Sequence, residues 1–300
     1  MILCVGSWAR RVVRLTKQMS IAELQRWIGK TETVEDEITP VPMMALAATL
    51  DLDVQRPRPG DPLPPLWHWL YFLSIHRQAE LGAEGHSMKG GFLPAVPLPR
   101  RMWAGGRFEF HRPLRVGETY TRNSQIVEIN QKEGKTGPLV FVIARHEIGD
   151  REGIALVEEQ DLVYREEPKT GEPTPAPKAA PTGAKWERMI RPDGVLLFRY
   201  SALTFNAHRI HYDWRYATRT EGYPGLVVHG PLIATLLAEL LRREMARSAL
   251  KRFSFRAVSP LFDTAPFKIC GKPEGHGKTI SLWAQNESGG LATTSTAEIA

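Results

Sequence analysis

Hydrophobic positions recur at helical spacing in three stretches of the chain. Residues 231–243 open with Pro231 and continue with apolar side chains three and four positions apart, which is typical of a buried helix. The segment PVPMMALAATL at residues 40–50 has the same character. A third helix, IAELQRWIG, is predicted to begin after Ser20, because Glu23 completes a capping box.

Elsewhere the pattern alternates between hydrophobic and polar residues. This alternation predicts antiparallel strands separated by turns at residues 107–131, 137–150 and 153–166. The apolar, aromatic-rich segment 194–200 predicts a further strand. Proline excludes regular structure from 55–65, which we expect to be an exposed connection, and glycine and proline in 82–106 predict a long ordered loop.

The C-terminal part of the chain repeats the order of the N-terminal part. RFEF at Arg107 corresponds to RFSF at Arg252, and REGIALVEEQDLVY corresponds to GGLATTSTAEIA, with offsets of about 145 residues. An offset this long indicates a duplicated domain rather than a solenoid. The pattern therefore predicts two copies of an α+β unit, each an antiparallel sheet around a helix.

A linker composition separates the two copies. Residues 166–185 are rich in Pro, Ala, Thr and charge. We therefore predict a leader or an over-extended start at 1–18, an N-terminal domain at 19–165 and a C-terminal domain at 186–300.

The composition limits the class of protein. With 42% hydrophobic and 24% charged residues the chain is typical of a soluble globular protein. No apolar run approaches the roughly 18 residues that span a bilayer. Cys4 and Cys270 have no metal-binding spacing, so we expect a reducing compartment and no metal.

The net charge of +6 is concentrated at the start of the chain, where four of the charges are supplied by Arg10, Arg11, Arg14 and Lys17. Because the remainder is nearly neutral, nucleic-acid binding is not expected. The acid-free leader is consistent with a mitochondrial transit peptide or with an over-extended start of a cytoplasmic protein.

Polar side chains capable of chemistry gather between residues 204 and 230. Asn206, His208, His211 and Asp213 lie within eight residues, and a His-Gly pair precedes the helix at 231–243. This order resembles the motif of the MaoC-like hot-dog hydratases and dehydratases of acyl thioesters, in which Ser-Gly-Asp-x-Asn-Pro precedes a His, an Asp, an aromatic-Ala pair and a later His-Gly.

The motif is altered in this chain. Thr204 stands where the family has Ser, Phe205 replaces Gly, Asn206 replaces the catalytic Asp, and 207–209 replaces x-Asn-Pro. The altered form, SALTFN followed by HRIHYD, is similar to that of 3-hydroxyacyl-thioester dehydratase type 2 and of bacterial mesaconyl-CoA and itaconyl-CoA hydratases. Segments TLDLD, PPLWHWLYF and GFLPAVPLPRRMWAGG extend the resemblance over nearly the whole chain.

The resemblance implies a double hot-dog fold with a catalytic C-terminal half and a substrate-holding N-terminal half. It also implies a cofactor-independent homodimer that reversibly hydrates an α,β-unsaturated acyl-CoA, with a short branched or dicarboxylic acyl group. The alternatives are a fatty-acyl 3-hydroxyacyl-thioester dehydratase, a hot-dog thioesterase and a non-catalytic acyl-CoA-binding protein.

The same resemblance assigns roles to individual residues. His211 is expected to exchange a proton, since its ordinary pKa is near neutrality, while Asn206 orients water through its amide. The backbone N–H at Gly230 is expected to face the thioester carbonyl at the helix N-terminus. Asp213 either orients the imidazole or caps the following turn. Supporting or substrate-contacting roles fall to His208, His229, Arg209 and Arg256.

Overall fold

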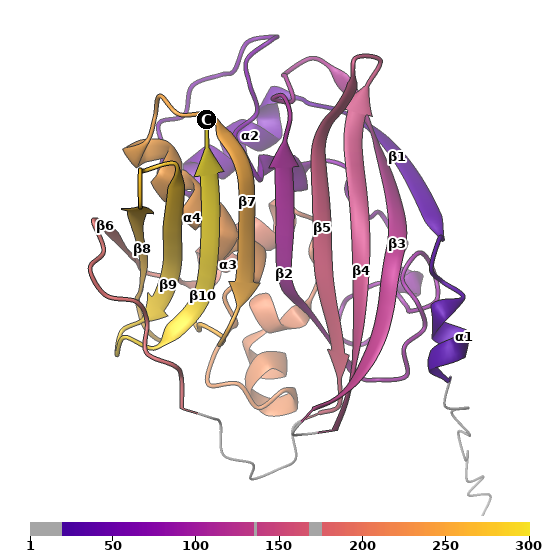
Figure 1. Cartoon of the computed structure of the whole chain (residues 1–300). Helices are drawn as coiled ribbons and strands as arrows, with labels where there is room; N and C mark the ends of the chain where they lie inside the picture. Colours follow the sequence, from indigo (N-terminus) through magenta and orange to yellow (C-terminus); the bar gives the residue numbers. More distant parts are fainter. Residues whose placement is uncertain (1–19, 135–136, 168–175) are drawn as a thin grey trace, which may run out of the picture.

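The structure, a computed structural model, describes residues 20–134, 137–167 and 176–300. Within them a ten-stranded antiparallel sheet carries the helices on one face, in the order β1-β3-β4-β5-β2-β7-β10-β9-β8-β6 (Figure 1). The first half supplies β1 (Thr31–Glu37), β2 (Arg100–Phe110), β3 (Thr119–Gly134), β4 (Gly137–Asp150) and β5 (Gly153–Arg165). The second half supplies β6 (Trp186–Ile190), β7 (Leu250–Ala257), β8 (Phe267–Glu274), β9 (Thr279–Asn286) and β10 (Leu291–Ile299).

Read outward from its centre, the sheet has the same strand order in both halves. β2 and β7 meet at the centre, where the repeated segments RFEF and RFSF pair antiparallel and Phe108 lies opposite Phe253. The two rings are 6.1 Å apart, and Phe255 stacks on Phe108 at 6.2 Å. The predicted duplicated α+β fold is therefore confirmed, whereas the domain limits at 19–165 and 186–300 remain a prediction.

Helix α4 (Gly230–Glu244) packs beneath the second half of the sheet, against β8, β9 and β10. All its residues from Leu232 to Leu241 are buried, and all but Thr235 and Glu239 are apolar. The buried Glu239 accepts a hydrogen bond from the indole of Trp67 at 3.0 Å and pairs with Arg242 at 2.6 Å. The predicted helix at 231–243 is confirmed.

The two other predicted helices are also present. α2 (Pro40–Thr49) has a proline in its first turn, as expected. α1 (Ile21–Gln25) begins with the predicted capping box between Ser20 and Glu23, but it is shorter than the segment IAELQRWIG.

The predicted strand at 194–200 is wrong, because this segment forms helix α3 (Gly194–Leu203). Asp193 caps it by accepting a hydrogen bond from the backbone N–H of Leu196 at 2.7 Å. Only one side of the helix is buried, and Val195 and Phe198 are exposed. These exposed β-branched and aromatic residues gave the sequence its strand-like character.

The long loop predicted at 82–106 ends earlier than expected. Residues from Arg100 onward pair with β5, so β2 includes the last part of the predicted loop. The connection at 55–65 contains no helix or strand, and the aromatic segment after it supplies the buried side chains of Trp67, His68, Leu70, Tyr71 and Phe72.

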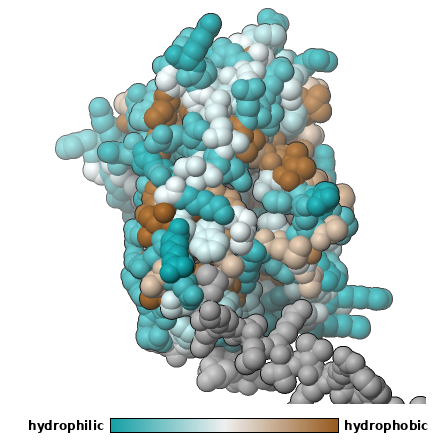
Figure 2. Space-filling view, turned by 90° about the vertical axis from the view of Figure 1, so that its right-hand side faces the viewer, coloured by the Kyte–Doolittle hydropathy of each residue, from teal (hydrophilic) through white to brown (hydrophobic). Residues whose placement is uncertain are grey.

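The outer strand of the first half, β1, is polar on its exposed positions. Charged and polar side chains on such a strand oppose pairing with another chain. Figure 2, in which this side of the molecule faces the viewer, shows a mainly hydrophilic surface with separate hydrophobic patches. No helix in the described part of the chain is long and apolar enough to cross a membrane.

Candidate active site

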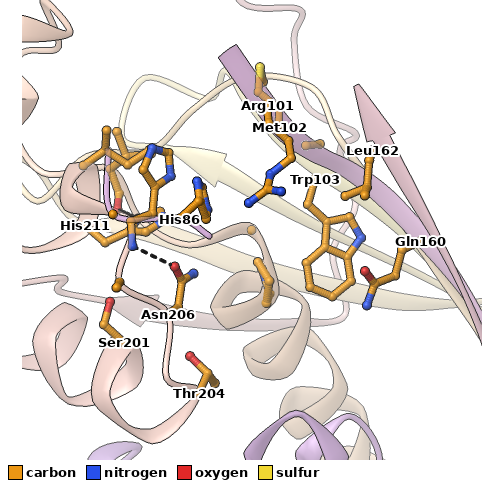
Figure 3. A pocket seen from close by; sticks show the side chains of 18 of the residues that line it. His86, Arg101, Met102, Trp103, Gln160, Leu162, Ser201, Thr204, Asn206 and His211 are labelled. Atoms are coloured by element: carbon orange, nitrogen blue, oxygen red, sulfur yellow. Dashed lines mark hydrogen bonds between the residues drawn. The ribbon is translucent and has the colours of Figure 1, made fainter. Parts of the chain in front are cut away.

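The polar segment between α3 and α4 borders a cavity of about 2100 Å³ that both halves of the chain line. Asn206, His208, His211 and Gly230 all contribute to its wall from the second half. The first half contributes residues from β2, from β5 and from the loop before β2 (Figure 3). The fold therefore brings most of the predicted site residues to one cavity.

His211 is buried, with 8% of its surface exposed, and it ends a short 3-10 turn at Arg209–His211. Its Nδ1 lies 2.7 Å from the carbonyl oxygen of Val227. Because a carbonyl oxygen only accepts, Nδ1 carries the proton and Nε2 keeps its lone pair. Burial, against the opposing hydrogen bond to Val227, lowers the pKa of His211 to about 4, so the ring is neutral at pH 7.

Asn206 follows a backbone turn that a positive φ makes possible. Phe205, which replaces the family's glycine, has a φ of 50°, so the left-handed conformation occurs here without glycine. The side-chain oxygen of Asn206 accepts a hydrogen bond from the backbone N–H of His208 at 3.0 Å (Figure 3). Among the described residues none accepts a hydrogen bond from the Asn206 Nδ2, so this donor is available to a ligand.

His229, fully buried, lies behind His211. The two imidazoles stack with centroids 3.7 Å apart, and Nε2 of His229 lies 2.8 Å from the hydroxyl of Ser201. Burial, together with the neighbouring histidines, holds the pKa of His229 well below its ordinary value. This ring therefore supports His211 as a neutral surface.

His208 packs between two other imidazoles. Its ring lies 4.2 Å from that of His86 and 5.5 Å from that of His211, edge-on in the second case. Burial, and then the charges of His211, Arg101 and Arg100, lower the pKa of His208 to about 3. The site is thus a row of neutral histidines.

His86 reaches these histidines from the first half, and no local motif around it predicted this position. The loop that carries it is fixed to the second half by a hydrogen bond from the Arg209 backbone N–H to the Glu84 carbonyl at 2.9 Å. Gly85 has a φ of 97°, and a Cβ on it would lie 1.8 Å from the carbonyl oxygen of Ala207. Glycine is therefore required for this close approach.

Asp213 caps a turn and does not orient His211. Its carboxylate accepts a hydrogen bond from the backbone N–H of Tyr216 at 3.0 Å and pairs with Arg209 at 2.8 Å. Arg209 also lies over the ring of Tyr216, at 4.2 Å, so its guanidinium is held by protein groups. Arg256 is exposed on β7 and does not line the cavity, in contrast to the expected substrate contact.

Gly230, the first residue of α4, lines the cavity and has a backbone N–H, whereas the next residue, Pro231, has none. His229 is the N-cap residue, and its side chain makes no capping hydrogen bond. Unpaired N–H groups and the positive end of a helix dipole favour negative charge. This end of the cavity can therefore stabilise a carbonyl oxygen that gains charge.

The described residues contain no group of three or more His, Cys, Asp or Glu side chains suited to hold a metal ion. Around the cavity the described residues offer a neutral imidazole, an amide and a helix N-terminus.

Comparison with known proteins identifies the family. Residues 66–263 match the family hydroxyacyl-thioester dehydratase type 2. The chain is 49% identical to mesaconyl-C(4)-CoA hydratase of Chloroflexus aurantiacus, over 94% of this chain and 99% of that protein. It is 29% identical to the mitochondrial hydroxyacyl-thioester dehydratase type 2 of Schizosaccharomyces pombe, over 76% of this chain and 82% of that protein.

Solved structures agree on the fold. A MaoC-like dehydratase from Phytophthora capsici superposes with a TM-score of 0.70 at 14% identity, covering 94% of this chain and 98% of that one. A Mycobacterium tuberculosis protein described as a double hot-dog fold has a TM-score of 0.57 at 14% identity, covering 91% and 96%. The predicted double hot-dog fold is confirmed, and the chain belongs to the hydroxyacyl-thioester dehydratase type 2 family of MaoC-like hot-dog proteins.

Proposed function

We propose that this protein is a hydro-lyase that reversibly adds water to the α,β double bond of a short enoyl-CoA thioester, without a cofactor. The favoured acyl group is branched or dicarboxylic, such as 3-methylfumaryl (mesaconyl). The observation that carries this proposal is the neutral His211, whose free Nε2 belongs to a cavity-lining ring near Asn206. The 49% identity to a mesaconyl-C(4)-CoA hydratase supports it.

The proposed reaction assigns one proton transfer to His211. Its Nε2 takes a proton from water as the water oxygen bonds to the β-carbon, and the electron pair of the double bond moves toward the thioester carbonyl. The backbone N–H of Gly230 and the positive end of the α4 dipole stabilise the resulting charge, and the imidazolium returns the proton to the α-carbon. The free Nδ2 of Asn206 donates to the water oxygen and holds it in place.

Further roles follow from this scheme. His208 and His229 keep the His211 ring in position through their ring contacts. The second half then carries the chemistry, and the first half holds the remainder of the substrate.

A fatty-acyl 3-hydroxyacyl-thioester dehydratase is the second candidate, which the family match and the yeast relative favour. The first-half wall of the cavity argues for a shorter acyl group, because it contains the buried Glu158. This carboxylate accepts hydrogen bonds from His68 at 2.9 Å, Trp69 at 3.0 Å and Gln160 at 2.8 Å. A long aliphatic chain gains little where it meets this carboxylate.

A thioesterase needs a carboxylate that activates water at the carbonyl. α4 carries two carboxylates, Glu239, which is buried against Trp67 and Arg242, and Glu244 at its last residue, and neither lines the cavity. This arrangement disfavours the thioesterase.

One assay distinguishes these classes. Incubation with short and long enoyl-CoA thioesters is followed by the absorbance of the conjugated double bond and by thiol release. A hydratase loses the absorbance without releasing thiol, and His211→Ala is expected to lower its turnover by about a hundredfold to ten-thousandfold. The exposed His276→Ala is the matched control. Thiol release, or a His211→Ala variant with more than half of the turnover, would reject the proposal.

The homodimer and the cytoplasmic location that the resemblance implies also belong to this proposal. The relative from Chloroflexus aurantiacus is bacterial, whereas the yeast relative is named mitochondrial. The basic segment 1–18 lies outside the described residues. Light scattering of the purified chain tests the dimer, and a fluorescent fusion with and without this segment tests the location.

A further inference from the structure

Arg101 is a half-buried cation that lines the cavity without a carboxylate partner among the described residues. Three other arginines that border the cavity or its polar segment are paired. Arg100 pairs with Glu221 at 2.7 Å, Arg122 with Glu32 at 3.3 Å and Arg209 with Asp213 at 2.8 Å. The neighbouring hydroxyl of Tyr164 carries no charge, so no described carboxylate neutralises the Arg101 guanidinium, which can bind an anion.

The position of Arg101 places this charge near the candidate reacting centre. It lies on β2 opposite the buried Tyr164, and Figure 3 shows its side chain directed into the space bounded by His86 and Trp103. The pKa values of His86 and His208 are lowered, first by burial and also by the charge of Arg101. An imidazole carries either no charge or a positive charge, so neither ring compensates the positive guanidinium.

Two carboxylates border this part of the cavity together with Arg101. Glu221 is paired with Arg100 at 2.7 Å, and the charge of Glu84 acts on Lys89. Lys89 donates to the carbonyl oxygens of Val96 and Leu98, and it adds a second positive charge. Arg165 also lines the cavity without a carboxylate partner in the described part of the chain, but its charge does not contribute to the pKa of His86 or His208. The region around Arg101 thus favours an anionic group.

The candidate anions of an acyl-CoA differ in where they lie. The CoA phosphates are separated from the thioester by the whole pantetheine arm, so they do not reach the acyl end of the cavity. A carboxylate on the β-carbon lies directly beside the bond that is hydrated. The planar guanidinium of arginine matches a carboxylate in a two-point hydrogen-bonded pair.

We propose that Arg101 binds the free carboxylate of a β-carboxylated enoyl-CoA and thereby selects four-carbon dicarboxylic monothioesters, with or without a methyl branch, over neutral enoyl thioesters. This assignment rests on the proposed hydratase function. The guanidinium favours the carboxylate and also disfavours a neutral acyl group of the same length. Such a group would leave the half-buried guanidinium desolvated and unpaired. Arg101 is then a specificity-determining residue contributed by the first half to chemistry on the second half.

A binding experiment tests this assignment independently of turnover. Titration calorimetry with succinyl-CoA and butyryl-CoA compares two unreactive ligands of the same length that differ in the carboxylate. The wild type is expected to bind succinyl-CoA at least tenfold more tightly, as for one lost charge-assisted hydrogen bond. Arg101→Met should lose this preference, and Arg101→Lys should keep part of it.

The matched control is Arg165→Met, which removes another unpaired cavity cation. This substitution should leave the preference for succinyl-CoA unchanged. If Arg165 contacts the CoA phosphates, the affinities for both ligands should fall equally. A wild type without preference, an Arg101→Met variant that keeps it, or a loss of preference in Arg165→Met would overturn the assignment. If circular dichroism shows that Arg101→Met is not folded, the preference of the wild type and that of Arg101→Lys test the assignment instead.

Kinetics separate this inference from the function on which it rests. On 3-methylfumaryl-CoA, Arg101→Met should lower kcat/KM about a hundredfold, and on crotonyl-CoA it should change kcat/KM less than threefold. An equal loss on both substrates contradicts the selectivity role. A wild type that prefers succinyl-CoA in binding but hydrates neither thioester rejects the hydratase and leaves carboxylate recognition standing.

Discussion

The Nδ1 of His211 donates a hydrogen bond to the carbonyl oxygen of Val227 across 2.7 Å. The backbone N–H of Val227 in turn donates to the carbonyl of Ile210 at 3.0 Å. The carbonyl group that accepts from the imidazole is therefore held in place by the backbone next to His211. A hydrogen bond of this kind determines which ring nitrogen acts as the base.

The first prediction concerns the acidic limb of the pH–rate profile. Since burial lowers the pKa of His211 to about 4, the base form persists down to that pH. We expect kcat/KM for hydration to fall as the pH drops through about 4, and to change little near 6.5. Initial rates in a series of buffers measure this limb. A limb at the ordinary histidine pKa would contradict the assignment of the base.

Asn206 provides the second prediction. Asn206→Asp keeps an oxygen that accepts from the His208 backbone N–H, and it recreates the Asp of the wider family, so we expect substantial activity. The new carboxylate favours the imidazolium and raises the pKa of His211, which moves the acidic limb to higher pH. Asn206→Ala loses the turn and the donor and should lower turnover.

The pH–rate profiles of both Asn206 variants and the wild type are measured on the same enoyl-CoA. Circular dichroism checks that the variants are folded. A folded but inactive Asp variant would mean that the reaction requires the amide donor itself, and the wider family's Asp then has no counterpart here.

The third prediction tests the contact that brings His86 into the site. Gly85→Ala places a Cβ 1.8 Å from the Ala207 carbonyl oxygen, so the loop has to move. We expect a loss of about 2–4 kcal/mol in the free energy of unfolding, with a fall in activity although no cavity side chain is replaced. Urea denaturation and the hydration assay measure the two effects.

The matched control for this variant is Gly60→Ala. Gly60 has a similar φ of 87°, and nothing lies within 4 Å of the position of a Cβ. Gly60→Ala should lower the free energy of unfolding by about 1 kcal/mol through backbone strain alone, and it should leave activity intact. Equal effects of the two substitutions would argue against a steric contact between the halves.

Protonation of the buried histidines supplies the fourth prediction. The pKa values of His208 and His211 are lowered by burial to about 3 and about 4, so between these values and the ordinary 6.5 the unfolded chain binds more protons. Stability is therefore full above pH 6.5 and is lost as the pH falls below it. At pH 5 each of these two histidines should lower the free energy of unfolding by about 2 kcal/mol.

Urea denaturation at pH 7 and pH 5 measures this loss. His211→Gln removes one of the titrating groups and should show a correspondingly weaker pH dependence. The same dependence in the variant and the wild type would rule out the buried neutral ring as its source.

Much of the fold was predictable because its signals are local. The apolar run of α4 identifies a helix without reference to the rest of the chain, and the RFEF and RFSF segments identify β2 and β7 because their sequences repeat. Helix α3 was mispredicted because its exposed Val195 and Phe198 imitate a strand, and only the contact of its buried side shows which structure forms.

The site was predictable only on the second half. Asn206 and His211 lie in one short segment with a familiar order, whereas His86 and Arg101 are more than a hundred residues away along the chain. Their approach depends on contacts between the halves, such as the bond from Arg209 to the Ala83 carbonyl at 3.0 Å. No spacing in the sequence encodes such a contact.

The pairing of β2 with β7 also bears on how the two sides of the molecule can diverge. If two identical chains paired through these strands, every substitution near the contact would occur in both chains. A change that improved one site would then also alter its copy. Because both strands belong to one polypeptide, each side accumulates substitutions independently. Arg101 and His211 each occur once in the chain and come from opposite sides of the β2–β7 pair. Because one polypeptide contains both halves, recognition and catalysis can evolve under separate selection.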